Sequence, residues 1–287
     1  MMSGRWFRVF LGLVLVLTLA SCLLACEEEP ADNGRLGVVV TIPPLADFVE
    51  NVGGDLVDVL TVMVPAGRSP HSYEPLPSQL EQVARADVFV KVGSGVEFEL
   101  VWMEKMIERN REMLVVDCST GIARLGNDPH IWNSPANAIR MVENICEGLA
   151  EADHPDNRAR YEAGRDTYLQ ELNELDVYIH QRLDSYSSRY FMIYHPAFGY
   201  FAKEYGLVQL AIEPEGGSIT GKVIQGCIDE AEEHELKYVF VAPQFAADNA
   251  EVVAEAIGGQ IASVDPLGAL YIPNMRSVAD AIALELE

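Results

Sequence analysis

Short apolar runs alternate with helical patterns through the first half of this chain. The runs are four to eight residues long and rich in valine, as is typical of buried strands, and they lie at 37–42, 57–64, 87–93 and 113–117. Segments with a helical pattern follow the first three runs, at 45–52, 79–86 and 98–109. Strands that alternate with helices in this way predict a parallel sheet with helices on both faces.

A second block with the same alternation begins near Tyr190, and its strand-like runs lie at 191–194, 207–212, 238–242 and 260–264. Between the blocks, apolar residues recur at three- and four-residue steps, namely at Tyr168, Leu172, Leu175, Ile179, Leu183 and Tyr186. This stripe predicts one long helix, with Pro155 in its first turn and Asp153 or His154 as its cap. A helix of about 34 residues would be about 50 Å long.

The N-terminus has the pattern of an export signal. Arg5 and Arg8 precede an apolar run at 9–19, which is shorter than the ~20 residues of a spanning helix and therefore predicts a signal peptide. The run leads into L-A-S-C and then L-L-A-C, which both resemble the lipobox of lipoproteins. We favour Cys26 as the lipidated residue because a polar segment follows it at once, with Cys22 as the alternative. A soluble exported protein is the other interpretation.

Charge and cysteine content narrow the class of protein. The formal net charge of −24 argues against a nucleic-acid partner, which requires a basic surface. The three cysteines beyond the signal region, Cys118, Cys146 and Cys227, are odd in number and scattered. They therefore do not indicate a disulfide framework, and we expect buried thiols.

Three histidines in turn-forming contexts follow predicted strands. They lie in S-P-H-S-Y-E-P (His71), D-P-H-I-W-N-S-P (His130) and Y-H-P-A-F-G-Y-F (His195), and Asp265 in V-D-P-L-G closes the last strand. Three imidazoles and one carboxylate suit a borderline transition metal. The four residues lie roughly 60–70 positions apart, so only a fold that gathers distant strand ends can unite them. This pattern predicts a metal cleft rather than a zinc finger.

From about Leu36 to the C-terminus, these motifs resemble the metal-binding cluster A-I family of ABC-transporter solute-binding proteins, in the same order and spacing. The resemblance implies that His71, His130, His195 and Asp265 coordinate the metal. It also implies an α/β fold of two lobes, each with a parallel β-sheet flanked by helices, joined by one long rigid helix, with the metal between the lobes.

On this basis we expect a signal peptide with lipobox at 1–26, a flexible linker at 27–35, an N-terminal lobe at 36–153, a linking helix at 154–189 and a C-terminal lobe at 190–287. The implied function is an extracytoplasmic, lipid-anchored receptor that captures a divalent metal ion and delivers it to an ABC permease. We expect a monomer at the outer face of the cell membrane or in the periplasm, with no catalytic residues.

Carboxylates near the motif histidines are candidates for orienting them. Glu74 and Asp128 each lie close in sequence to a motif histidine and would fix the tautomer of an imidazole, although either carboxylate would equally suit a helix N-terminus. For Glu213 and Glu215 in I-E-P-E-G-G-S, we favour a position on a polar loop rim over one that lines the cleft.

The resemblance bears on which metal is bound. Its manganese-binding members often have Glu at the third position, where this chain has His195, so Zn²⁺ is favoured. Many zinc-binding members carry a histidine-rich loop before the second motif, and this chain does not, which leaves Mn²⁺ and iron open. Two other classes remain: a metal-dependent hydrolase, disfavoured because the chain lacks H-E-x-x-H and a nucleophile elbow, and an adhesin stabilised by its metal.

Overall fold

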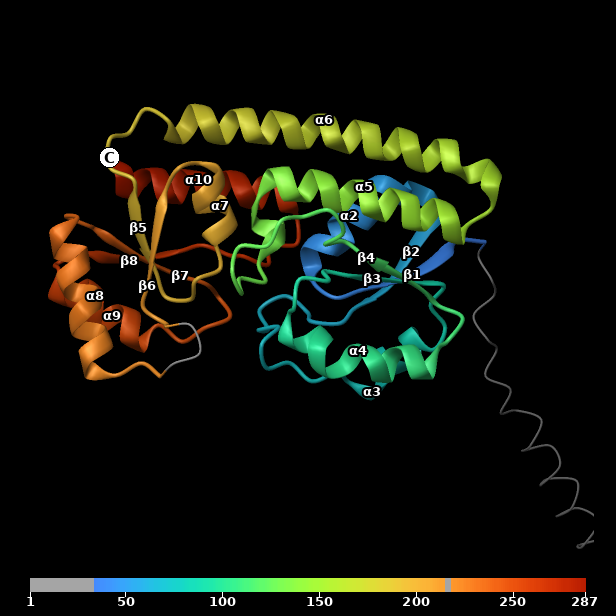
Figure 1. Cartoon of the computed structure of the whole chain (residues 1–287), viewed down its shortest axis with the longest axis horizontal. Coiled ribbons are helices and arrows are strands. Elements are labelled where there is room, and N and C mark those ends of the chain that lie inside the picture. The colour runs from blue at the N-terminus through green and yellow to red at the C-terminus, as the bar shows by residue number, and fades with distance from the viewer. Residues whose placement is uncertain (1–33, 215–217) are drawn as a thin grey trace, which may run out of the picture. The chain divides into compact units, whose positions relative to one another are not determined.

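Two four-stranded parallel sheets form the framework of the computed structural model, which describes residues 34–214 and 218–287 (Figure 1). The first sheet has the order β2-β1-β3-β4 and comprises β1 (Leu36–Val40), β2 (Val57–Val62), β3 (Val88–Lys91) and β4 (Leu114–Asp117). The second has the order β6-β5-β7-β8 and comprises β5 (Tyr190–Ile193), β6 (Val208–Ala211), β7 (Tyr238–Val241) and β8 (Gln260–Ser263).

Both sheets therefore repeat one strand order, in which the first strand of each block lies between the second and the third. At such a switch point the loops at the carboxyl ends of the strands diverge and leave room for a ligand. The strand predictions are confirmed in all eight cases, with boundaries that differ by three residues or fewer.

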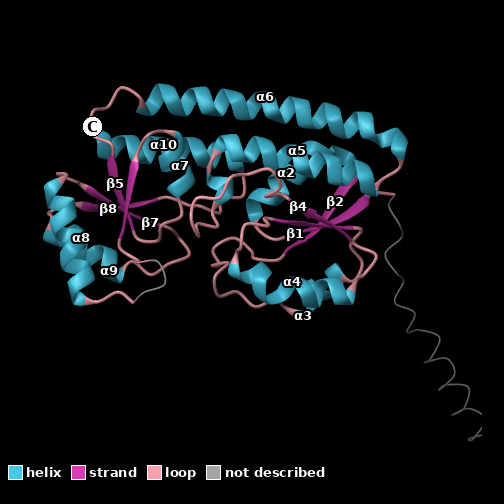
Figure 2. Cartoon of the chain, in the orientation of Figure 1, coloured by secondary structure: helices cyan, strands magenta, loops and turns pink. Residues whose placement is uncertain are grey.

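Helices surround the sheets (Figure 2). In chain order they are α2 (Pro43–Gly53), α3 (Pro77–Val83), α4 (Glu97–Arg109), α5 (Pro135–Ala152), α6 (Arg158–Leu183), α7 (Gly199–Glu204), α8 (Gly221–Glu233), α9 (Asp248–Ala256) and α10 (Tyr271–Leu286). Three of them begin with proline, whose fixed φ suits the first helical position. The hydroxyl of Ser134 caps α5 by accepting a hydrogen bond from the Asn137 amide at 3.1 Å.

The long helix α6 passes over both sheets and lies against α2, α5 and α10 (Figure 1). Its predicted apolar stripe is buried from Tyr168 to Leu183. Pro155 opens a separate 3₁₀ turn, and α6 itself begins at Arg158. Two tyrosine hydroxyls of α6 connect it to neighbouring helices. Tyr168 donates to Asp47 of α2 at 2.7 Å, and Tyr178 donates to Asp280 of α10 at 2.8 Å.

One continuous apolar core joins the two sheets. It runs from Val38 and Phe89 of the first sheet through Leu172 of α6 and Met275 of α10 to Phe191 of the second sheet. A smaller core on the other face of the second sheet lies beneath α8 and α9. Residues 35–287 accordingly form one compact unit, and the predicted fold class is confirmed.

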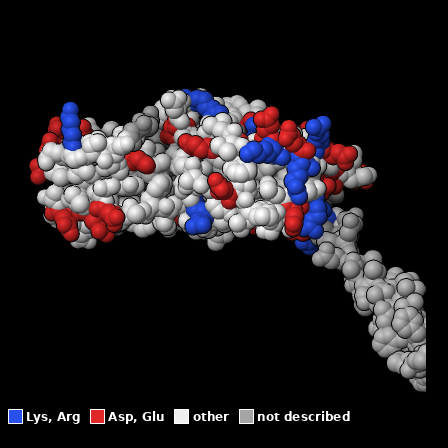
Figure 3. All heavy atoms as spheres, turned by 90° about the horizontal axis from the view of Figure 1, so that it is seen from below, with Lys and Arg blue, Asp and Glu red and all other residues white. Residues whose placement is uncertain are grey.

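The predicted buried thiols are also confirmed, because Cys118, Cys146 and Cys227 are buried and free. The signal peptide, Cys22, Cys26 and Glu215 lie outside the described residues. Within residues 34–214 and 218–287, none of the helices is both long and apolar enough to cross a membrane. Seen from below, acidic side chains are spread along the visible face, and basic ones lie mainly toward the end that carries the first sheet (Figure 3).

Two helical glycines test how closely α6 packs. A Cβ at Gly164 of α6 would lie 2.3 Å from the Val52 carbonyl oxygen, whereas a Cβ at Gly226 of α8 would meet nothing within 4 Å. We predict that Gly164→Ala lowers the free energy of unfolding by about 1–3 kcal/mol through overpacking. Gly226→Ala should raise it by about 0.5–1 kcal/mol through helix propensity.

Urea denaturation of the metal-free proteins measures both changes. If Gly164→Ala were as stabilising as Gly226→Ala, α6 would not pack against the α2 backbone as described.

Candidate metal centre

Three histidine side chains converge at the carboxyl ends of the strands, between the two sheets. His195 Nε2 lies 3.1 Å from His71 Nε2 and 3.2 Å from His130 Nε2. His71 lies on the loop after β2, His130 ends the loop after β4, and His195 lies two residues after the end of β5. Residues that are distant in the chain therefore present one nitrogen each to a single point.

Each imidazole is held from behind by a carboxylate at Nδ1. His71 Nδ1 lies 2.6 Å from Glu97 Oε2, His130 Nδ1 lies 2.8 Å from Asp128 Oδ1, and His195 Nδ1 lies 2.5 Å from Glu213 Oε2. A carboxylate accepts only, so each Nδ1 must carry the proton that it donates. Each Nε2 then presents a lone pair, which is the tautomer that metal ligation requires.

The three lone pairs repel one another unless a cation lies among them. Two nitrogens bound to tetrahedral zinc at about 2.0–2.1 Å lie about 3.3–3.4 Å apart, close to the observed 3.1 and 3.2 Å. The donor set and its spacing therefore fit a borderline divalent ion.

The surroundings of the imidazoles are largely apolar. The cavity beside them has a volume of about 10 Å³, and its lining includes Pro70, Trp132, Phe245, Pro266 and Leu267. The ring of Phe245 stacks on His195 with centroids 4.6 Å apart. Burial, together with repulsion from His130, lowers the pKa of His195 to about 4, against the opposing effect of Glu213. The fold thus keeps this imidazole neutral at pH values where a free histidine is protonated.

Local sequence explains how two of the loops are shaped. Gln79 of α3 is buried and holds the His71 loop, donating to the Val62 and Met63 carbonyls at 2.9 Å and accepting from Tyr73 and the Leu76 amide.

Asp128 forms a tight turn by accepting from both the backbone and the ring of His130. Gly199 is required beside it, because a Cβ there would lie 2.4 Å from Asp128 Oδ2.

The carboxylates differ in part from those that the sequence suggested. Asp128 orients His130 as expected, but Glu97 takes the role that we expected for Glu74, which is exposed. Glu213 holds His195 instead of lying on a loop rim, which corrects the interpretation that we favoured. Both missed partners lie far from their histidine in sequence, 26 and 18 positions away, so no local pattern identified them.

Asp265 lies nearby but does not join the three histidines. In the described part of the chain, the group of His, Cys, Asp and Glu residues whose ligand atoms lie within 4.8 Å of one another consists of His71, His130 and His195. The Asp265 Oδ1 atom instead accepts hydrogen bonds from Gln244 Nε2 at 2.7 Å and from the Leu267 amide at 2.9 Å.

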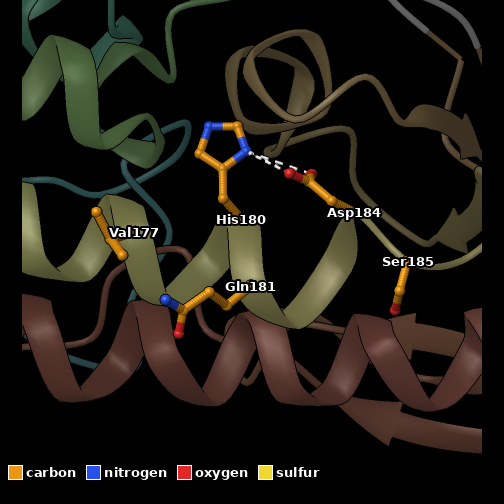
Figure 4. A pocket seen from close by; sticks show the side chains of 5 residues that line it. All are labelled: Val177, His180, Gln181, Asp184 and Ser185. Atoms are coloured by element: carbon orange, nitrogen blue, oxygen red, sulfur yellow. Dashed lines mark hydrogen bonds and ion pairs between the residues drawn. The ribbon is translucent and has the colours of Figure 1, made fainter.

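His180 is a histidine whose ring nitrogens do not converge with those of other histidines. It lines a shallow surface depression on α6 and faces Asp184 at 3.1 Å (Figure 4). Its other nitrogen lies 3.7 Å from Asp176. The two ring nitrogens face different carboxylates, so these residues do not present their ligand atoms to one point.

Comparisons with known proteins identify the family that this chain matches. Residues 38–284 match a protein-family model, and the description of that family is "Zinc-uptake complex component A periplasmic". The manganese-binding lipoprotein MntA of Halalkalibacterium halodurans is 32% identical over an alignment of 289 positions. The alignment covers 96% of this chain and 90% of that protein.

Two solved structures are similar at 39% identity over 88% of this chain. A crystal structure of ZnuA is matched over 100% of its length with a TM-score of 0.85. A 138–173 deletion mutant of ZnuA with zinc bound is matched over 98% of its length with a TM-score of 0.84.

The lowered pKa of His195 predicts how the metal-free protein responds to acid. Between the ordinary histidine pKa of about 6.5 and the folded value of about 4, the unfolded chain binds a proton at His195 that the folded protein does not. Stability is therefore lost as pH falls through this window, by about 3 kcal/mol at most from this group.

Urea denaturation in the presence of a chelator, from pH 7.5 to 4, should show this loss in the wild type and a shallower loss in His195→Gln. Parallel curves for the two proteins would contradict the neutral, buried imidazole.

Proposed function

This chain belongs to the zinc-uptake complex component A family of periplasmic proteins, and we propose that it captures a divalent metal ion outside the cytoplasmic membrane and delivers it to an ABC permease. The observation that carries the proposal is the convergence of three Nε2 atoms, each fixed by a carboxylate on Nδ1. His71, His130 and His195 are the proposed ligands, and Asp265 is the proposed carboxylate that supports the fourth side.

Zn²⁺ is the proposed cargo. Neutral imidazoles suit zinc, whereas manganese prefers carboxylate, carbonyl and water oxygens. In this structure Glu97, Asp128 and Glu213 engage the far side of the rings rather than the converging nitrogens. A ZnuA variant at 39% identity was solved with zinc bound. Mn²⁺ is the second candidate, because the 32% identical MntA is named a manganese-binding lipoprotein.

The cavity favours binding over catalysis. Its volume of about 10 Å³ is roughly the space of one water-sized sphere and lies far below the ~300–1,000 Å³ typical of pockets for organic ligands, so it suits an ion better than a substrate. The three carboxylates nearest the imidazoles are engaged with Nδ1 atoms and are poorly placed to act as a general base. We therefore propose a transport receptor rather than a hydrolase.

The anchor and the domain limits complete the proposal. Relatives are named lipoproteins, and we propose Cys26, with Cys22 as the alternative, as the site of lipid attachment. A diacylated cysteine holds a protein at the membrane without spanning it. We propose lobes at 36–153 and 190–287, a linking segment at 154–189, and a monomer as the transporting form.

Removal of any one imidazole tests the ligand assignment. We predict that His71→Ala, His130→Ala and His195→Ala each weaken Zn²⁺ binding strongly. The loss should exceed the ~10–100-fold expected when a residue that hydrogen-bonds to a metal ligand is removed. Calorimetric titration of Zn²⁺ into the chelator-treated proteins measures the change. In direct competition, the wild type should prefer Zn²⁺ to Mn²⁺.

His154→Ala is the matched control, because His154 is exposed and interacts with Asp156. It should bind Zn²⁺ as the wild type does. Wild-type affinity in any of the three site variants would remove that residue from the site, and a preference for Mn²⁺ would replace zinc as the cargo.

A further inference from the structure

Gln244 is a polar residue beside the histidine cluster. It lies on the loop between β7 and α9 and lines the same cavity as His71, His130 and His195. Asp265 is not among the residues that line this cavity. The C-terminal lobe therefore contributes an amide side chain, rather than a carboxylate, to the lining of this cavity.

The orientation of this amide is fixed. Its Nε2 donates a hydrogen bond of 2.7 Å to Asp265 Oδ1, the oxygen that also accepts from the Leu267 amide. Turning the amide over would set Oε1 against the Asp265 carboxylate, where neither oxygen has a proton to donate. Asp265 thus holds the amide with its oxygen on the other side.

The amide oxygen itself is buried and unsatisfied. Among the described residues, Gln244 Oε1 has no hydrogen-bond partner. A buried acceptor in this state costs stability, and such groups call for a specific explanation. Because Gln244 lines the cavity that the three Nε2 atoms enter, a donor associated with the ion would satisfy this oxygen.

We propose that Gln244 is the residue of the C-terminal lobe that faces the bound ion, and that Asp265 acts on the ion through Gln244 rather than as a direct ligand. This inference rests on the proposed function and specifies which residue faces the fourth side of the bound ion. Zinc with three protein ligands commonly takes water as the fourth. That water donates a hydrogen bond to Gln244 Oε1, which cannot accept the proton itself, so the water stays a ligand and does not become a nucleophile.

A double-mutant cycle tests the route from Asp265 to the ion. Gln244→Leu and Asp265→Ala should each weaken Zn²⁺ binding by about 10–100-fold, and the double variant should lose no more than Gln244→Leu alone. Asp265→Asn should recover most of the loss caused by Asp265→Ala, since its amide oxygen still accepts from Gln244 Nε2. Additive losses, or an Asp265→Asn variant as weak as Asp265→Ala, would show that Asp265 ligates directly.

The visible absorption of bound Co²⁺ supplies a readout that a merely structural role would not move. Azide should replace the water and shift the Co²⁺ bands in the wild type, and Gln244→Leu should alter those bands before azide is added. Unaltered bands in Gln244→Leu would overturn the proposal.

Two controls separate this inference from the proposed function. Gln225→Leu changes an exposed glutamine on α8 whose amide donates to Asp229 at 2.8 Å, and it should bind Zn²⁺ normally. His71→Ala should lose Zn²⁺ binding in the same assay. If His71→Ala bound Zn²⁺ as the wild type does, the three-histidine site would fail. If only the Gln244 variants behaved as the wild type does, the inference alone would fail.

Discussion

The hydrogen bond between a carboxylate and imidazole Nδ1, repeated three times, is the interaction on which this site depends. It settles the tautomer of His71, His130 and His195 and turns each Nε2 toward the same point. The three Nε2 lone pairs repel one another, and the surrounding fold is rigid enough to hold the rings in place against this repulsion. A divalent ion relieves that repulsion, so the arrangement of the three histidines in the folded protein already favours metal binding.

The fold supplies the rigidity. Two sheets with the same strand order direct their loops to one place, and a single apolar core that includes α6 and α10 joins them. Polar links cross between the blocks beside the site, from Trp132 Nε1 to the Pro266 carbonyl at 2.6 Å and from Asn133 Nδ2 to the Ala197 carbonyl at 2.9 Å. The loops that carry His130 and His195 are therefore fixed relative to each other.

How far the sequence predicts this structure depends on the range of each interaction. Valine-rich runs located every strand, and the turn motifs located the three histidines, because both signals are local. Asp128 was found because it lies two positions from His130, whereas Glu97 and Glu213 meet their histidines only through tertiary folding. The contact at Asp265 is of the same long-range kind, because the side-chain amide of Gln244 donates to its Oδ1 from 21 positions away. Nothing in the sequence near Asp265 signals that contact.

The most direct test of the account is anomalous X-ray scattering at the zinc absorption edge from crystals grown with Zn²⁺. We predict one strong peak between the sheets, bonded to Nε2 of His71, His130 and His195 at about 2.0–2.1 Å. A peak elsewhere on the molecule, or an ion bonded to fewer than three of these imidazoles, would contradict the central claim that three oriented imidazoles make the metal site.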